Sequence, residues 1–211
     1  MPKPFNKLTA VAAPIMRSYI DTDVIIRIER LVGNSVRGTL GKWAFGALRY
    51  LPDGSENPEF ILNREPYRQA EILVTGPNFG CGSSREGAVW SLQEMGIRAV
   101  IGSSFGDIFF ANCFQNGILP IVVDKEVVDG LAVEIEITQG AGRVAIDLEA
   151  QTITSPAGKK LRFEIDPRRR DGLLQGLDEV MLTLKRDDDI RAFQAADRAA
   201  RPWIHFAGKL A

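Results

Sequence analysis

Histidine is nearly absent from this sequence: among 211 residues there is one, His205, close to the C-terminus. A Ser-His hydrolase therefore has little support, because its serine needs a histidine beside it as a base. We expect His205 to pack beside Trp203 or Phe206 instead. Cysteine is equally scarce, since Cys81 and Cys113 are the only two. Two cysteines build neither a disulfide framework nor, on their own, a zinc or iron-sulfur site, so a metal would need ligands from elsewhere.

Excess charge and long hydrophobic runs are also missing. The 26 basic residues balance 27 acidic ones, and this balance excludes an overall field that favours nucleic acid or an anionic membrane. The densest basic stretch, "DPRRRDG" at 166–172, is flanked by aspartates and lacks aromatic residues for base stacking, so we expect a solvated turn. No stretch approaches the roughly 20 apolar residues that span a bilayer, and the N-terminus lacks a secretory pattern. We expect a cytoplasmic protein.

The centre of the chain alternates between apolar runs and helical spacing. "AEILVTG", "IRAVIG" and "ILPIVV" are typical of buried strands, and two helices separate them. The first helix has apolar residues three and four apart and ends at Gly96, and the second ends at Gly117. Two successive crossovers predict a parallel βαβαβ sheet covered by helices, an α/β fold.

The flanking regions have other patterns. "KLTAVAAPI" predicts a first strand, and the glycine-rich stretch 33–54 predicts a long, partly mobile connection. After Asp124, "VEIEIT", "RVAIDL", "QTITS" and "LRFEI" alternate apolar and polar residues, which predicts additional antiparallel strands. "DDDIRAFQAADRAARPW" predicts a C-terminal helix, and all these elements could share one core.

The segment "NFGCGSSREGA", residues 78–88, joins a predicted strand to a predicted helix. Helix N-termini at such turns bind anions, and Ser83, Ser84 and Arg85 add two hydroxyls and a guanidinium for a carboxylate or phosphate. A capping box from Ser83 to Glu86 is the competing interpretation, and Arg85 could equally be a surface charge. Cys81 is more typical of a small buried residue than of a nucleophile. The segment matches neither a Walker loop nor a dinucleotide fingerprint.

Six segments of the chain resemble a known family, in the same order along the sequence. They are "IDTDVII", "NPEFILN", "NFGCGSSREGAVWSL", "SSFGDIFFANCFQNGILP", "DLEAQTI" and "GLDEVMLTLKRDDDI". The run Gly-Cys-Gly-Ser-Ser-Arg-Glu is typical of the aconitase superfamily. The chain length and "DTD" make the sequence similar to the separate small subunits of isopropylmalate dehydratases.

This resemblance implies a swivelling β/β/α three-layer domain over residues 1–185, with a mobile loop at about 30–55, and a C-terminal helical extension over 186–211. It implies a large-subunit partner that holds a four-iron four-sulfur cluster, with no cofactor bound by this chain. The implied reaction, part of leucine biosynthesis, moves a hydroxyl of a small dicarboxylate substrate by dehydration and rehydration. A homo-oligomer of the isolated chain is a further expectation, because the surface that meets the partner can stay partly apolar.

The resemblance also implies roles for individual residues. Ser83 matches the serine whose alkoxide takes a proton from carbon, Ser84 a neighbour that contacts the substrate, and Arg85 the guanidinium that binds a substrate carboxylate. Arg37 matches a second carboxylate-binding arginine, although a solvated loop charge is the alternative.

Leu31 and Val32 lie where related subunits select the side chain of the substrate, and a core position is the alternative for Leu31. Three positions depart from the family pattern: Gly87 replaces histidine, Val89 replaces proline and Arg27 replaces proline.

The departures leave other substrates open, namely citraconate, dimethylmalate or homoaconitate. Two different kinds of protein also remain open at this stage. One is an anion-binding module that works without a partner, and the other is a scaffold subunit in which the turn at residues 78–88 only begins a helix.

Overall fold

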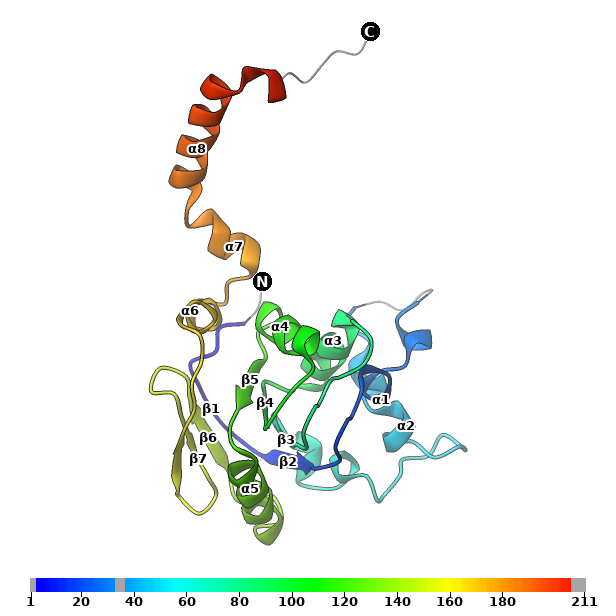
Figure 1. The fold of residues 1–211 in the computed structure, drawn as a ribbon. Helices are drawn as coiled ribbons and strands as arrows, with labels where there is room; N and C mark the ends of the chain where they lie inside the picture. Colours follow the sequence, from blue (N-terminus) through cyan, green and yellow to red (C-terminus); the bar gives the residue numbers. More distant parts are fainter. Residues whose placement is uncertain (1–2, 33–36, 206–211) are drawn as a thin grey trace.

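The structure is a computed structural model that describes residues 3–32 and 37–205. Two four-stranded sheets form its framework (Figure 1). The first is parallel, in the order β2-β3-β4-β5, and comprises β2 (Ala12–Ile15), β3 (Ile72–Thr75), β4 (Ala99–Gly102) and β5 (Leu119–Val122). The second is antiparallel, in the order β1-β6-β7-β8, and comprises β1 (Lys7–Ala10), β6 (Val144–Asp147), β7 (Thr152–Thr154) and β8 (Lys160–Arg162).

The predicted α/β fold and its parallel centre are confirmed. Helix α3 (Glu86–Met95) connects β3 to β4, and helix α4 (Asp107–Gln115) connects β4 to β5. Gly96 ends α3 in the left-handed region with φ of 103°, a conformation that glycine adopts without strain. All residues of β2, β3 and β4 are buried, so the parallel sheet lies at the centre of the core.

"KLTAVAAPI" was expected to be one strand and forms two. Val11 separates β1 from β2, and the chain passes from the antiparallel sheet to the parallel sheet at this residue. The side chain of Val11 is buried, so the transition is itself part of the core. Nine consecutive residues of strand character therefore supply one strand to each of the two sheets.

The prediction of a strand at "VEIEIT" is wrong, because this segment ends helix α5 (Lys125–Ile137). Val133 and Ile137, which created the alternating pattern, are exposed. The buried residues of the helix follow helical spacing and are Val128, Leu131, Ala132 and Ile135. With these residues α5 packs on β2, β3 and β4, and Figure 1 shows it on the other side of the sheet from α3 and α4.

Two expectations about the C-terminal third also need correction. "DPRRRDG" is no turn: Asp166 caps helix α6 (Pro167–Gln175), and its carboxylate accepts a hydrogen bond from the backbone N–H of Arg169 at 3.0 Å. Helices α7 (Glu179–Leu184) and α8 (Asp187–Ala200) follow, and a short 3-10 turn, η5 (Pro202–Ile204), comes next.

The helix expected near the C-terminus is confirmed as α8, but no residue of it is buried, so it does not share the core. Figure 1 shows α7 and α8 leading away from the two sheets. The division of the chain at residue 185 remains a prediction. The Nε2 of His205 lies 2.6 Å from Oδ2 of Asp197. Its expected packing beside Trp203 or Phe206 remains a prediction, and Phe206 lies outside the described residues.

The long connection between β2 and β3 contains short helical turns, joined by irregular segments. The turns are α1 (Thr22–Ile25), η1 (Ile28–Arg30), η2 (Gly41–Trp43), α2 (Gly46–Arg49), η3 (Ile61–Asn63) and η4 (Tyr67–Gln69). Leu40, Ala44 and Phe45 are buried and fix this connection to the core, where η2 packs on α3. Residues 33–36 of the predicted mobile loop lie outside the described residues, and its mobility remains a prediction.

Both edge strands of the parallel sheet contain a proline, Pro14 in β2 and Pro120 in β5. Proline is tolerated at a sheet edge because one side of an edge strand has no neighbouring ladder. Within residues 3–32 and 37–205, no helix is both long and apolar enough to cross a bilayer.

Candidate functional site

The loop between β3 and α3 lies at the carboxyl end of the parallel sheet, where ligands of open α/β sheets bind. Its course depends on glycine, since Gly80 has φ of 72° and a Cβ there would lie 2.2 Å from Cγ of Phe109. The "DTD" segment holds this loop. The backbone N–H of Thr22 donates to the carbonyl of Cys81 at 2.9 Å, and its hydroxyl donates to the carbonyl of Ser83, also at 2.9 Å. Two sequence segments 61 residues apart thus form one structural unit.

Ser83 and Ser84 are both exposed, and the predicted capping box does not form. Helix α3 begins at Glu86 with Arg85 as its N-cap residue, and no side chain caps it. The hydroxyl of Ser83 has no hydrogen-bond partner in the described part of the chain and faces a cavity of about 350 Å³. Ser83 is therefore available for a ligand at the start of a helix.

Arg85 is largely buried, with 17% of its side chain exposed, and its guanidinium pairs with the carboxylate of Asp23. The hydrogen bond from Arg85 is the main reason that the pKa of Asp23 is lowered, and the N–H of Ile28 and the charge of Arg27 lower it further. The neighbouring Asp21, not Asp23, caps α1, and its carboxylate accepts a hydrogen bond from the N–H of Val24 at 2.8 Å. The link between Asp23 and Arg85 was missed because nothing in the local pattern points to a contact 62 residues away.

Arg37 is held in place by α3 and α4. Its Nη2 donates to Oδ1 of Asn116 at 2.9 Å, and its guanidinium lies 4.7 Å from the ring centroid of Trp90. Arg37 is consequently not a free loop charge. It lines a cavity of about 230 Å³ that we call the arginine cavity, whose wall consists of Leu31, Arg37, Leu40, Arg85, Glu86, Gly87 and Trp90.

Asn116, which the sequence did not single out, organises this cavity. It is 4% exposed, and its Oδ1 also accepts a hydrogen bond from Nε1 of Trp90 at 3.1 Å. Its Nδ2 donates to Oε1 of Glu86 at 2.9 Å and to the carbonyl of Asn112. With both donors and the acceptor used, the orientation of the amide is fixed, and so is the contact to Arg37. The sequence signal that could have indicated Asn116 was an asparagine at the end of the predicted helix, next to Gly117.

Leu31 reaches the arginine cavity through contact with α3. A Cβ at position 87 would lie 2.5 Å from Cδ2 of Leu31, so this leucine occupies space that any other residue at position 87 would fill. Gly87 and Leu31 thus form a matched pair. Val32 is 58% exposed and lines neither the arginine cavity nor the cavity at Ser83. The structure therefore gathers Leu31, Arg37 and Arg85, places Ser83 in a neighbouring cavity, and leaves Val32 at the surface.

The two cysteines differ in environment. Cys113 is fully buried, and burial raises the pKa of its thiol well above the usual range, whereas Cys81 is half-buried. In the ranges 3–32 and 37–205, no group of three or more histidine, cysteine or acidic residues is arranged to hold a metal ion.

Comparison with protein families covers most of the chain. A model described as the aconitase C-terminal domain matches residues 2–126. A model named LeuD_N matches residues 129–167, and one described as the C-terminal domain of the 3-isopropylmalate dehydratase small subunit matches residues 182–207. The first model ends shortly after β5, so it includes the parallel sheet and both cavities at its carboxyl end.

Individual relatives match nearly end to end. A protein of Gluconacetobacter diazotrophicus named 3-isopropylmalate dehydratase small subunit is 51% identical over 199 residues, which is 94% of this chain and 95% of that one. Its namesake from Gluconobacter oxydans is 50% identical over 201 residues, 95% and 94% of the two chains.

Among solved structures, 3-isopropylmalate dehydratase of Methanocaldococcus jannaschii superimposes with a TM-score of 0.62 at 25% identity, covering 89% of this chain and 99% of that one. The chain belongs to the family of 3-isopropylmalate dehydratase small subunits, within the aconitase superfamily.

Proposed function

We propose that this chain is the small subunit of a two-subunit hydro-lyase that interconverts 2-isopropylmalate and 3-isopropylmalate in leucine biosynthesis. The observation that carries the proposal is the arginine cavity, where the guanidinium groups of two arginines line the same space as two leucine side chains. The substrate has two carboxylates and a branched apolar group. The two guanidinium groups of the wall match the two carboxylates of the substrate in number, and the leucines offer an apolar surface for the branched group.

Arg37 and Arg85 would each take one carboxylate. A guanidinium binds a carboxylate through two parallel hydrogen bonds, which fixes orientation as well as charge. Arg85 already pairs with Asp23, and a guanidinium has five N–H donors, so it can keep Asp23 while it receives a substrate oxygen. Asp23 would then hold Arg85 at the cavity wall. Leu31 would contact the isopropyl group of the substrate.

Ser83 would take the proton from the substrate carbon. A serine hydroxyl is far too weak an acid to act as a base at neutral pH, so its surroundings must favour the alkoxide. Ser83 lies three residues before the start of α3, and the N-terminus of this helix and the guanidinium of Arg85 would supply positive charge. The absence of a capping hydrogen bond leaves its oxygen available, and the neighbouring hydroxyl of Ser84 can bind the substrate.

The large subunit would close the site and supply what this chain lacks. A four-iron four-sulfur cluster on that partner would act as the Lewis acid for the hydroxyl that leaves the substrate. The residues of this chain bind the diacid, orient it and move the proton at Ser83. The two exposed serines and the open cavities are consistent with a site completed by another chain.

The proposal can be tested by co-expressing this chain with the large subunit encoded in the same genome and reconstituting the cluster under anaerobic conditions. We expect isopropylmalate to be preferred over citraconate, dimethylmalate and homoaconitate. Ser83→Ala should lower kcat about 10²- to 10⁴-fold, the usual contribution of a general base. Ser18→Ala, at an exposed turn outside both cavities, serves as the control and should retain full activity.

Three results would count against the proposal. Full activity of Ser83→Ala would remove the serine from the mechanism. A preference for another diacid would keep the mechanism and change the substrate. Tight binding of isopropylmalate to the isolated chain, with no activity when the large subunit is present, would favour an anion-binding module.

A further inference from the structure

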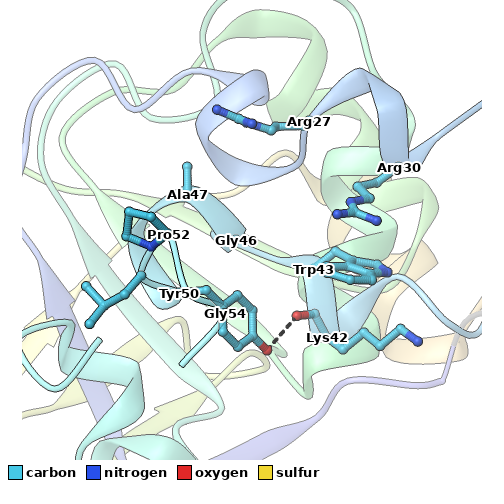
Figure 2. Close-up of a pocket in the computed structure, with 10 residues that line it drawn as sticks. Arg27, Arg30, Lys42, Trp43, Gly46, Ala47, Tyr50, Pro52 and Gly54 are labelled. Carbon is cyan, nitrogen blue, oxygen red and sulfur yellow. Dashed lines mark hydrogen bonds between the residues drawn. The ribbon is translucent and has the colours of Figure 1, made fainter. Parts of the chain in front are cut away.

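A third cavity of about 730 Å³, larger than the arginine cavity, is lined by residues that flank the segment containing Leu31 in sequence. Figure 2 shows its wall, and we call it the cationic cleft. Its lining residues are Arg27, Arg30, Lys42, Trp43, Gly46, Ala47, Tyr50, Leu51, Pro52 and Gly54. It shares no lining residue with the arginine cavity, so it is a separate feature of the surface.

The residues that line the cationic cleft carry an excess of positive charge. Three cations line it, and none of its ten lining residues is acidic. The guanidinium of Arg30 lies 3.6 Å from the ring centroid of Trp43, and the ammonium of Lys42 lies 5.3 Å from the same ring. In the described part of the chain, neither cation has a carboxylate within ion-pair distance. Two like charges beside one indole ring repel each other, and a carboxylate bound in the cleft would offset that repulsion.

We propose that the cationic cleft receives a carboxylate side chain presented by the large subunit. This inference rests on the proposed function, which requires such a partner. The composition of the cleft favours a protein over a small molecule, because arginine, tryptophan and tyrosine are the residues that carry most of the binding energy at protein interfaces. The apolar residues beside them, Leu51 and Pro52, would contact the rest of the partner segment.

The position of the cationic cleft gives a second argument. Arg30 lines the cationic cleft and the next residue, Leu31, lines the arginine cavity. Arg27 also lines the cleft, and its charge contributes to the lowered pKa of Asp23, the partner of Arg85. The segment from Asp23 to Leu31 therefore separates the two cavities. A subunit that covers the arginine cavity comes within reach of the cationic cleft.

Charge reversal in the cleft tests the inference. The affinity of the small subunit for the reconstituted large subunit would be measured by isothermal titration calorimetry at two salt concentrations. We expect Arg30→Glu and Lys42→Glu each to raise Kd about tenfold or more, with a weaker salt dependence than the wild type has. The neutral variants Arg30→Gln and Lys42→Gln should raise Kd less. Lys160→Glu, an exposed reversal on β8, is the matched control and should leave Kd unchanged.

A catalytic readout separates the cleft from the substrate site. At saturating small subunit, kcat for isopropylmalate should equal the wild-type value in all cleft variants that unfold at the wild-type temperature. If the wild-type chain binds but the reversals bind equally well, the inference is wrong and the proposed function stands. If the wild-type chain does not bind the large subunit, both fail. If the reversals change only inhibition by a small anion such as citrate, the occupant is a small molecule and the inference is wrong.

Discussion

Replacing Gly87 with alanine tests how the arginine cavity obtains its shape. The added Cβ would lie 2.5 Å from Cδ2 and 2.7 Å from Cδ1 of Leu31, and no carbon pair can stay that close. Both atoms are at the free end of a flexible side chain, so Leu31 must rotate away while the helix stays in place. The substitution therefore changes the shape of the cavity wall without disturbing α3.

Two opposing effects determine how much Gly87→Ala changes the free energy of unfolding. Alanine is favoured over glycine in a helix by up to about 1 kcal/mol. Forcing an extra methyl group into a packed contact costs about 1–3 kcal/mol, and the mobile end of Leu31 places this case at the lower limit. The free energy of unfolding should therefore change by less than about 1 kcal/mol. The value of kcat/KM for isopropylmalate should fall about tenfold, because a misplaced methyl group in an apolar pocket has effects of roughly that size.

A double-mutant cycle with Leu31→Ala separates the two effects. In the Leu31→Ala background the clash is absent, so Gly87→Ala should stabilise the chain by the full helical preference of up to about 1 kcal/mol. Urea unfolding of the isolated chain measures all four variants. The same effect of Gly87→Ala in both backgrounds would refute the contact between Leu31 and position 87.

Three further predictions concern the residues around the site. Because Arg85 lowers the pKa of Asp23, this carboxylate stabilises the folded chain above its unfolded pKa of about 4 and loses that contribution as the pH falls through the lower folded value. In Asp23→Asn, the free energy of unfolding should thus fall less steeply as the pH is lowered below about 4. An unchanged pH dependence would contradict the ion pair between Asp23 and Arg85. Asn116→Ala leaves the donors of Arg37 and Trp90 unpaired, so we expect a loss of about 2–4 kcal/mol in urea unfolding and a raised KM, with Asn112→Ala as the comparison. Cys113, fully buried, should react with a thiol reagent only on unfolding, whereas half-buried Cys81 should react in the native chain, and equal rates would contradict these environments.

The parallel centre of the fold could be predicted from sequence because its signals are local. Short apolar runs mark the buried strands, and Gly96 ends α3 at the expected residue. The error at α5 arose because Val133 and Ile137 are exposed apolar residues, so the alternation they create with Ile135 carries no information about burial. A window over the whole of 125–137 shows the helical spacing instead.

The contacts of the site could be predicted only in part. The family resemblance indicated Ser83 and Arg85, and the spacing of Ser83 and Glu86 suggested a cap that does not form. The contacts of Asn116 with Arg37 and of Asp23 with Arg85 were missed because these residues lie 79 and 62 positions apart in sequence, and local patterns carry no record of such contacts. The exposed position of α8 was missed for a related reason, since an amphipathic helix has the same pattern whether or not a partner covers it.

The two prolines at the edges of the parallel sheet also determine how this chain can assemble. The carbonyls of Val11 and Ile15 accept hydrogen bonds from β3 and the residues that flank it, and the N–H of Leu119 and that of Val123 donate to the β4 side. Successive residues of a strand direct their backbone groups to alternate sides, and Pro14 and Pro120 are out of phase with these bonded residues. The backbone nitrogen of each proline therefore points away from the neighbouring strand of the sheet.

A strand from a second molecule that tried to extend the sheet would find a missing N–H donor at both edges. Growth of the sheet into aggregates is therefore blocked at both ends without any charged residue being needed. A subunit that must remain soluble until it meets its partner gains from this protection, because it leaves recognition to the loops and side chains at the carboxyl ends of the strands.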